Sequence, residues 1–153
     1  MGSVRKIFVG LAVASVLALS SASSALAWSS QTNIACGSGD TLQSNMWLGT
    51  GMTFGWQASS ILWGSQPQVA SWISHDATVN VNGLFVGLSG SGGNVSGGTM
   101  SVHQEQNNQW FLGESGTLTV SNPFYVNING TTVTKAWVWG VLKVGSASTD
   151  KWW

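Results

Sequence analysis

The chain has 153 residues and a formal net charge of zero, because five basic residues balance five acidic ones. No Lys or Arg occurs between Ile7 and Thr134. Binding to nucleic acid or to anionic lipid depends on clustered Lys and Arg, and a phosphate-binding loop also needs a basic residue, so the composition argues against all three.

The first 27 residues have the organisation of a secretory signal peptide. Residues 5 and 6 form a basic head, and Ile7–Leu19 is an apolar run that is too short to span a bilayer comfortably. The small residues that follow contain an A-x-A site formed by Ala25 and Ala27, so we expect cleavage after Ala27. An uncleaved membrane anchor is the alternative. The mature protein would be a secreted or cell-surface domain of residues 28–153, without a transmembrane span.

Short runs with the period-two alternation of β-strands recur through this domain, and no long segment has the 3.6-residue period of a helix. The strand patterns lie at residues 42–48, 52–58, 68–74, 78–88, 99–104, 110–112, 117–120, 124–128 and 131–144. Residues 58–63 could instead form a helical turn. Ser89–Gly98 contains five glycines and is expected to be a loop.

These strands predict one small all-β domain. About eight or nine short strands separated by turn residues are typical of an antiparallel β-sandwich, jelly-roll or Ig-like, or of a squat barrel. The clearest hairpin signal is Asn129-Gly130 between the runs Phe124–Ile128 and Thr131–Val144, because both turn residues tolerate positive φ. This pairing would place Ile128 opposite Thr131.

The domain has a single cysteine, Cys36, which cannot form an internal disulfide. A buried inert thiol, a link to another chain and, less favoured, a lipid anchor are the three interpretations. The terminal pair Trp152-Trp153 is a second segment that could contact another chain.

Motifs for catalysis and metal binding are sparse. Gly87–Ser91 lacks the last glycine of a nucleophile elbow. His75 and Asp76 would point to opposite faces of a strand, or form a turn pair at a strand end. Two histidines, one cysteine and five scattered acids show no spacing typical of metal ligands, beyond a weak calcium site at Asp40 or Asp76. We therefore expect no cofactor.

One cluster, formed by His103, Glu105 and Glu114, contains the two carboxylates that a glycosidase needs as a minimum. His103 and Glu105 would share the polar face of a strand whose other face carries Met100 and Val102. Glu114 would come near Glu105 if residues 107–108 closed a hairpin. Two solvated acids on a polar face are the simpler interpretation.

All ten tryptophans fall in the expected mature domain. Each could bury about 150–250 Å², so a small core cannot hide them all. Strand parity predicts that Trp56 and Trp137 face the core. Four others are the candidates for an aromatic ligand-binding patch: Trp47, Trp63, Trp110 and Trp139.

Two classes of function follow from these patterns. The first is a secreted, non-catalytic β-sandwich that uses exposed tryptophans to bind a neutral ligand such as a polysaccharide, or to pack into an extracellular assembly. The second is a membrane-active protein, such as a bacteriocin or small pore-former, that inserts the low-charge hairpin Thr78–Gln104. A small hydrolase that uses Glu105 and Glu114 is the third and weakest hypothesis.

Overall fold

The structure is a computed structural model, and it describes residues 28–49, 51, 53–64, 69–83, 87–90, 94–96, 98–119 and 126–152. The expected signal peptide and its cleavage site, residues 1–27, lie outside the described residues. So do Phe124, Tyr125 and Trp153.

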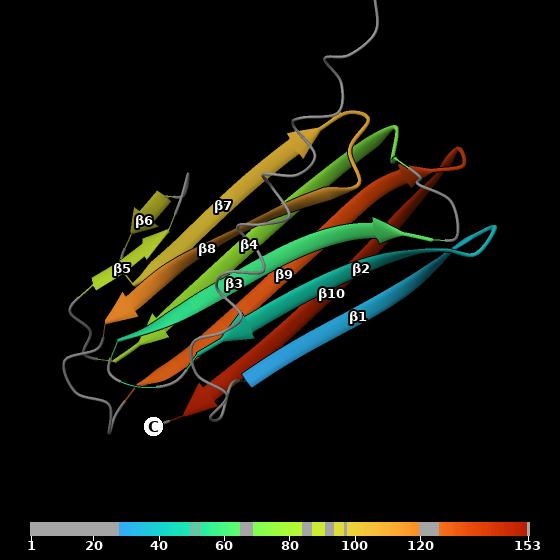
Figure 1. Cartoon of the computed structure of the whole chain (residues 1–153). Helices are drawn as coiled ribbons and strands as arrows, with labels where there is room; N and C mark the ends of the chain where they lie inside the picture. The colour runs from blue at the N-terminus through green and yellow to red at the C-terminus, as the bar shows by residue number, and fades with distance from the viewer. Residues whose placement is uncertain are drawn as a thin grey trace, which may run out of the picture.

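Every regular element in the described ranges is a β-strand, and the strands form two antiparallel sheets (Figure 1). The first sheet, sheet A, has the order β1-β2-β3-β8-β5, and the second, sheet C, has the order β10-β9-β4-β7-β6. The strands are β1 (Trp28–Gly37), β2 (Asp40–Leu48), β3 (Thr53–Trp63), β4 (Trp72–Asn82), β5 (Gly87–Gly90), β6 (Asn94–Ser96), β7 (Thr99–Gln106), β8 (Phe111–Thr119), β9 (Asn127–Val138) and β10 (Val141–Trp152).

The fold class expected from the sequence is confirmed at the level of an all-β chain with antiparallel strands in two sheets. The strands lie in two sheets and not in one closed sheet. Two strands lie where none was expected, β1 and the short β6, which falls in the predicted glycine-rich loop. Strand β5 covers the last two residues of the predicted strand 78–88 and the first two residues of that loop. The possible helical turn at residues 58–63 is instead the end of β3.

The two sheets pack face to face, with buried side chains from both sheets in contact between them. Burial alternates strictly along β2 and along the first ten residues of β9, as expected for strands with one face against a core. Apolar side chains from both sheets form two clusters, one around Met46, Trp56 and Val79 and the other around Leu42, Leu62 and Ile73. The described part of the chain contains no helix that is long and apolar enough to cross a membrane.

The predicted hairpin turn at Asn129-Gly130 is wrong, because β9 runs straight through these residues and pairs with β4 on one side and β10 on the other. Gly130 is buried, and a β-carbon there would overlap the side chain of Met46 on the facing sheet. The glycine therefore allows the two sheets to approach closely.

The actual turn between β9 and β10 consists of Trp139 and Gly140, with φ values of 54° and 74°. Positive φ at both central residues is the pattern of a type I′ hairpin turn. Positive φ is unfavourable for a bulky residue such as tryptophan. Trp139 is held in place by its indole N–H, which donates a hydrogen bond to Asp40 Oδ2 on β2 at 2.9 Å.

Candidate binding surface

Five tryptophans gather at one end of the two-layered fold, where β3 and β9 end and where β4 and β10 begin. We call this region the aromatic end. In Figure 1 it is the end at the upper right, which contains the β1–β2 and β9–β10 turns. The five residues are Trp63, Trp72, Trp110, Trp137 and Trp139.

Hydrogen bonds tie these segments of the aromatic end to one another. The backbone N–H of Leu62 donates to the carbonyl of Trp110 at 2.7 Å, and the N–H of Ser71 donates to the carbonyl of Trp137 at 3.1 Å. Ala70 forms an isolated bridge with Gln109. Because the indole of Trp139 reaches Asp40, the β9–β10 turn of sheet C is also joined to sheet A.

Most of these indoles are accessible to solvent. The exposed fractions are 52% for Trp63, 39% for Trp110, 43% for Trp137 and 57% for Trp139, whereas Trp72 is half-buried. Trp72 and Trp137 are direct cross-strand partners, and Leu142 is the partner of Trp137 on its other side. The three side chains therefore form a row across the outer face of sheet C.

The four tryptophans predicted to form a ligand-binding patch are not all at this end. Trp63, Trp110 and Trp139 are, but Trp47 lies near the opposite end of sheet A, where its indole packs against Gly55. Trp56 is buried as predicted. The prediction that Trp137 faces the core is wrong, because in β9 the even-numbered residues face inward.

Neutral polar groups accompany the aromatic side chains. The last residue of β7 and the connection to β8, together residues 106–110, are exposed throughout and have the sequence Gln-Asn-Asn-Gln-Trp. Trp110 and Phe111 stack at a tilt, with 5.8 Å between their ring centroids. Aromatic faces beside amide groups provide apolar contact and hydrogen bonding on the same surface.

The acidic group predicted around Glu105 and Glu114 is divided by the fold. Strand β7 pairs with β4 and β6 in sheet C, while β8 lies in sheet A, so residues 107–108 connect two sheets and close no hairpin. Glu105 is exposed on the outer face of sheet C, and Glu114 is buried between the sheets. The hypothesis that the two carboxylates share a site is therefore wrong, and the simpler interpretation of two solvated acids holds for Glu105 but not for Glu114.

His103 and Glu105 do share the outer face of β7, as predicted, and they belong to a surface ion network. His103 Nδ1 lies 2.5 Å from Asp76 Oδ1, and His103 Nε2 lies 3.3 Å from Glu105 Oε1. Lys135 adds a longer contact of 3.9 Å to Asp76. The hydrogen bond with Asp76 and the nearby carboxylates raise the pKa of His103. The side chains are largely solvated, so this network contributes little to stability.

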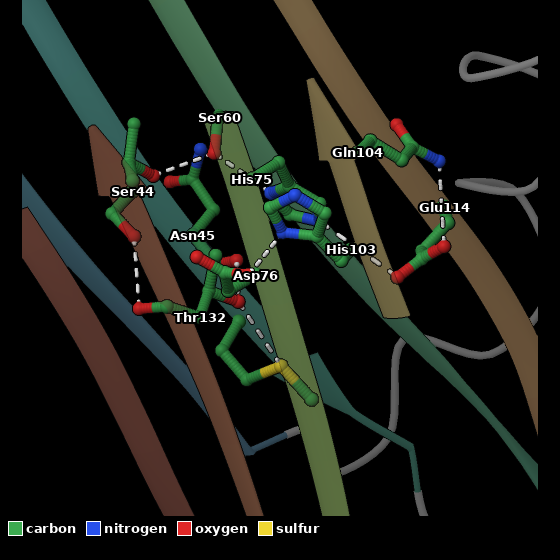
Figure 2. Close-up of polar contacts among 11 residues, drawn as sticks. Ser44, Asn45, Ser60, His75, Asp76, His103, Gln104, Glu114 and Thr132 are labelled. Atoms are coloured by element: carbon green, nitrogen blue, oxygen red, sulfur yellow. Dashed lines mark hydrogen bonds and ion pairs between the residues drawn. The ribbon is translucent and has the colours of Figure 1, made fainter. Parts of the chain in front are cut away.

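A belt of polar side chains, not predicted from the sequence, crosses the interior between the two apolar clusters. Figure 2 shows part of the belt, in which Ser60 Oγ lies 2.7 Å from His75 Nδ1. Ser60 Oγ also lies 2.6 Å from Thr134 Oγ1. The members that face the core are Ser44, Ser60, His75, Glu114, Thr132 and Thr134. Each takes a position that an apolar residue would occupy in the alternation of its strand. This departure from the alternation is the only feature of the sequence that could have indicated the belt.

His75 and Glu114 have the least favourable positions in this belt. His75 Nε2 and Glu114 Oε1 are 3.9 Å apart, too far for a hydrogen bond, and neither atom has a hydrogen-bond partner. Burial lowers the pKa of His75 to about 4 and raises the pKa of Glu114 to about 7. Both groups are therefore neutral at mildly acidic pH.

Ser60, His75 and Glu114 are residue types found in hydrolytic triads, but their location does not suit that chemistry. Ser60 and His75 are fully buried in the core, so a substrate has no route to the hydroxyl in this fold. His75 and Asp76 point to opposite faces, as predicted, but they lie within β4 and not at a strand end. The arrangement serves as a buried polar network of the core.

The remaining candidate residues are scattered. Cys36 is a free thiol, 6% exposed, and burial raises its pKa. Trp152, at the end opposite the aromatic end, is 78% exposed. Within the described ranges, no three His, Cys, Asp or Glu side chains are grouped so as to hold a metal ion.

Comparisons with protein-family models, with curated proteins and with solved structures give no match for this chain. The function is therefore argued from the arrangement of its own residues.

Proposed function

We propose that this chain is a secreted or cell-surface, non-catalytic β-sandwich module that binds a neutral polysaccharide through the tryptophans of the aromatic end. One observation carries the proposal. Except for Trp152, the large apolar side chains that are exposed in the described part of the chain lie at this end or within three residues of it. Trp63 is on the outer face of sheet A, and Trp137 and Leu142 are on the outer face of sheet C. Exposed apolar surface that is concentrated in one place is typical of a binding site.

The chemistry of the surface favours an uncharged ligand. Sugar rings present apolar faces that stack on indoles and hydroxyl groups that bond to amides, and the aromatic end offers both kinds of partner in Trp63, Trp110 and residues 106–109. Packing against another chain of an extracellular assembly is a second use of the same surface, because tryptophan is enriched at protein interfaces.

The alternative proposal is a membrane-active protein that inserts the hairpin Thr78–Gln104. Strands β4 and β7 of this segment do pair with each other. However, β4 also pairs along its whole length with β9, so insertion would require it to give up that second row of hydrogen bonds. This requirement places the membrane-active function second. Leakage of dye from vesicles would support it, and intact vesicles would count against it.

The proposed function predicts that Trp63→Ala weakens binding to an insoluble neutral polysaccharide, tested with cellulose, chitin and starch in a pull-down assay. Trp63 is half exposed, so its loss removes a ring face from the surface with little change in the core. A tryptophan at the centre of a binding site contributes about 2 kcal/mol or more, which is roughly 30-fold in affinity.

Trp152→Ala is the matched control, because Trp152 is the most exposed of the tryptophans whose side chains the structure describes and lies at the other end of the fold. We expect this variant to bind like the unmodified protein. Equal binding by all three proteins, or no binding to any of the polysaccharides, would rule out the proposal.

A further inference from the structure

The outer face of sheet A is free of charge. The side chains that β1, β2, β3 and β8 direct away from the core are Ser, Thr, Asn, Gln, Gly, Ala, Ile, Phe and Trp. The outer face of sheet C differs, because it carries Asp76, Glu105, Lys135 and Asp150 as well as His103. A charged partner would find no complementary group on the sheet A face.

A hydrogen-bonded row of amides crosses the middle of this uncharged face. Asn45 Nδ2 donates to Gln43 Oε1 at 3.0 Å and to Ser59 Oγ at 3.1 Å. Gln43 Nε2 donates to Asn33 Oδ1 at 3.0 Å, and Gln31 Nε2 donates to the same oxygen at 3.2 Å. We call Gln31, Asn33, Gln43, Asn45 and Ser59 the amide row.

The amide row is already ordered before any ligand arrives. The hydrogen bonds within it hold side chains that would otherwise rotate, which reduces the entropy lost on binding. A primary amide has two hydrogens to donate, and Gln31 and Gln43 each use one of them in these bonds. The second hydrogen of each can be donated to a hydroxyl oxygen.

Aromatic side chains flank the amide row on both sides along the direction of β2. Trp63 belongs to the aromatic end and is the cross-strand partner of Thr41, at the start of β2. Trp47 lies further along β2, with its indole against Gly55 of the neighbouring strand. The six residue-to-residue steps from Thr41 to Trp47 span roughly 20 Å at the rise of a β-strand. That distance corresponds to a stretch of polymer and not to a single sugar.

We propose that the ligand is a linear, uncharged polysaccharide that extends from Trp63 over the amide row to Trp47. This inference rests on the proposed function and deepens it, because it specifies a chain of sugars instead of an isolated one. Trp63 stacks on a sugar ring at one end, the amides bond to hydroxyl groups in the middle, and Trp47 contacts the distal part of the chain.

The test compares a disaccharide and a hexasaccharide from each polysaccharide that the protein retains, by titration calorimetry. We expect the hexasaccharide to bind more tightly. The double variant Gln43→Ala with Asn45→Ala should weaken binding of the hexasaccharide by about tenfold, since two neutral hydrogen bonds are lost, and leave binding of the disaccharide unchanged. Asn127→Ala with Asn129→Ala is the matched control, because these amides lie on the outer face of sheet C.

The outcomes separate this inference from the proposed function. Equal affinity for both oligosaccharides, or an unaffected double variant, overturns the inference, while sensitivity to Trp63→Ala still supports the proposed function. Failure to bind any polysaccharide overturns both. Sedimentation analysis gives a further criterion. If the unmodified protein is a dimer and the Gln43→Ala, Asn45→Ala double variant is a monomer, a second copy of the chain covers this face. The inference would then be wrong.

Discussion

Glu114 is the residue whose environment differs most from what the sequence suggests. It lies in the polar belt, with its Oε1 atom unpartnered and facing His75. Burying an ionised carboxylate is unfavourable, so Glu114 keeps its proton in the folded protein to a pH of about 7. The free energy of unfolding therefore depends on pH through this side chain.

The direction of that dependence follows from the protons bound in each state. As the pH rises from 4.5 to about 7, the unfolded chain releases the proton of Glu114 while the folded protein retains it, so stability falls. As the pH falls from 6.5 to about 4, the unfolded chain protonates His75 while the folded protein does not, so stability falls in that direction too. The two effects oppose each other between pH 4.5 and 6.5, where we expect a plateau.

Glu114→Gln removes one of these two titrating groups, the carboxyl, and keeps the shape of the side chain. We expect the variant to match the unmodified protein near pH 4.5 and to be more stable above pH 7, by about 3 kcal/mol, because glutamine has no proton to lose. Urea denaturation at a series of pH values measures this difference. Identical pH profiles for the two proteins would mean that Glu114 ionises normally and that the belt admits water.

Gly130 provides a second prediction at the scale of one residue. A β-carbon at this position would overlap Met46 and approach Leu48, both of which are buried on the facing sheet. Gly130→Ala should therefore destabilise the fold by about 1–3 kcal/mol, the usual cost of overpacking a core.

Gly55→Ala is the control for this substitution, because a β-carbon at Gly55 would lie 3.4 Å from Trp47, an ordinary contact. We expect a change of less than about 1 kcal/mol for this variant in the same urea titration. If the two variants lost similar amounts of unfolding free energy, both glycines would be needed for the conformation of the strand backbone and not for the close approach of the sheets.

At the scale of elements, the alternation of residues was enough to predict most strands but not the turns. The β9–β10 region illustrates the difference. Asn129-Gly130 has the composition of a type I′ turn yet lies inside β9, whereas Trp139-Gly140 forms the turn although tryptophan disfavours positive φ. The contacts of Met46 with Gly130 and of Asp40 with Trp139 determine which of the two dipeptides forms the turn. Both come from the facing sheet and cannot be read from local sequence.

The same limit explains the errors about individual side chains. Trp137 was expected to face the core because the parity of β9 was counted from the wrong turn, whereas Trp56 was predicted correctly from clean alternation in β3. Glu105 and Glu114 would have met only if residues 107–108 closed a hairpin, as short connections often do. Here residues 107–108 pass from one sheet to the other.

At the scale of the whole molecule, the arrangement of strands produces features that no single segment carries. The five tryptophans of the aromatic end come from four separate parts of the chain. The polar belt likewise takes its members from β2, β3, β4, β8 and β9. The excess of tryptophan could be read from composition, but its concentration at one end, and the absence of charge on one face, depend on which strands are neighbours.

Strand order also predicts how the molecule opens, and this distinguishes the two proposed functions. Strands β4 and β9 are each paired on both sides in sheet C, while β1 and β6 are paired on one side only. Amide hydrogen exchange should therefore be slowest in β4 and β9 and faster in β1 and β6, because a central strand exchanges only when larger parts of the sheet open. The measurement is exchange followed by mass spectrometry at neutral pH. If β4 and β7 instead exchanged rapidly and together, the segment Thr78–Gln104 would be a unit that detaches from β9, which is the property that a membrane-inserting hairpin requires.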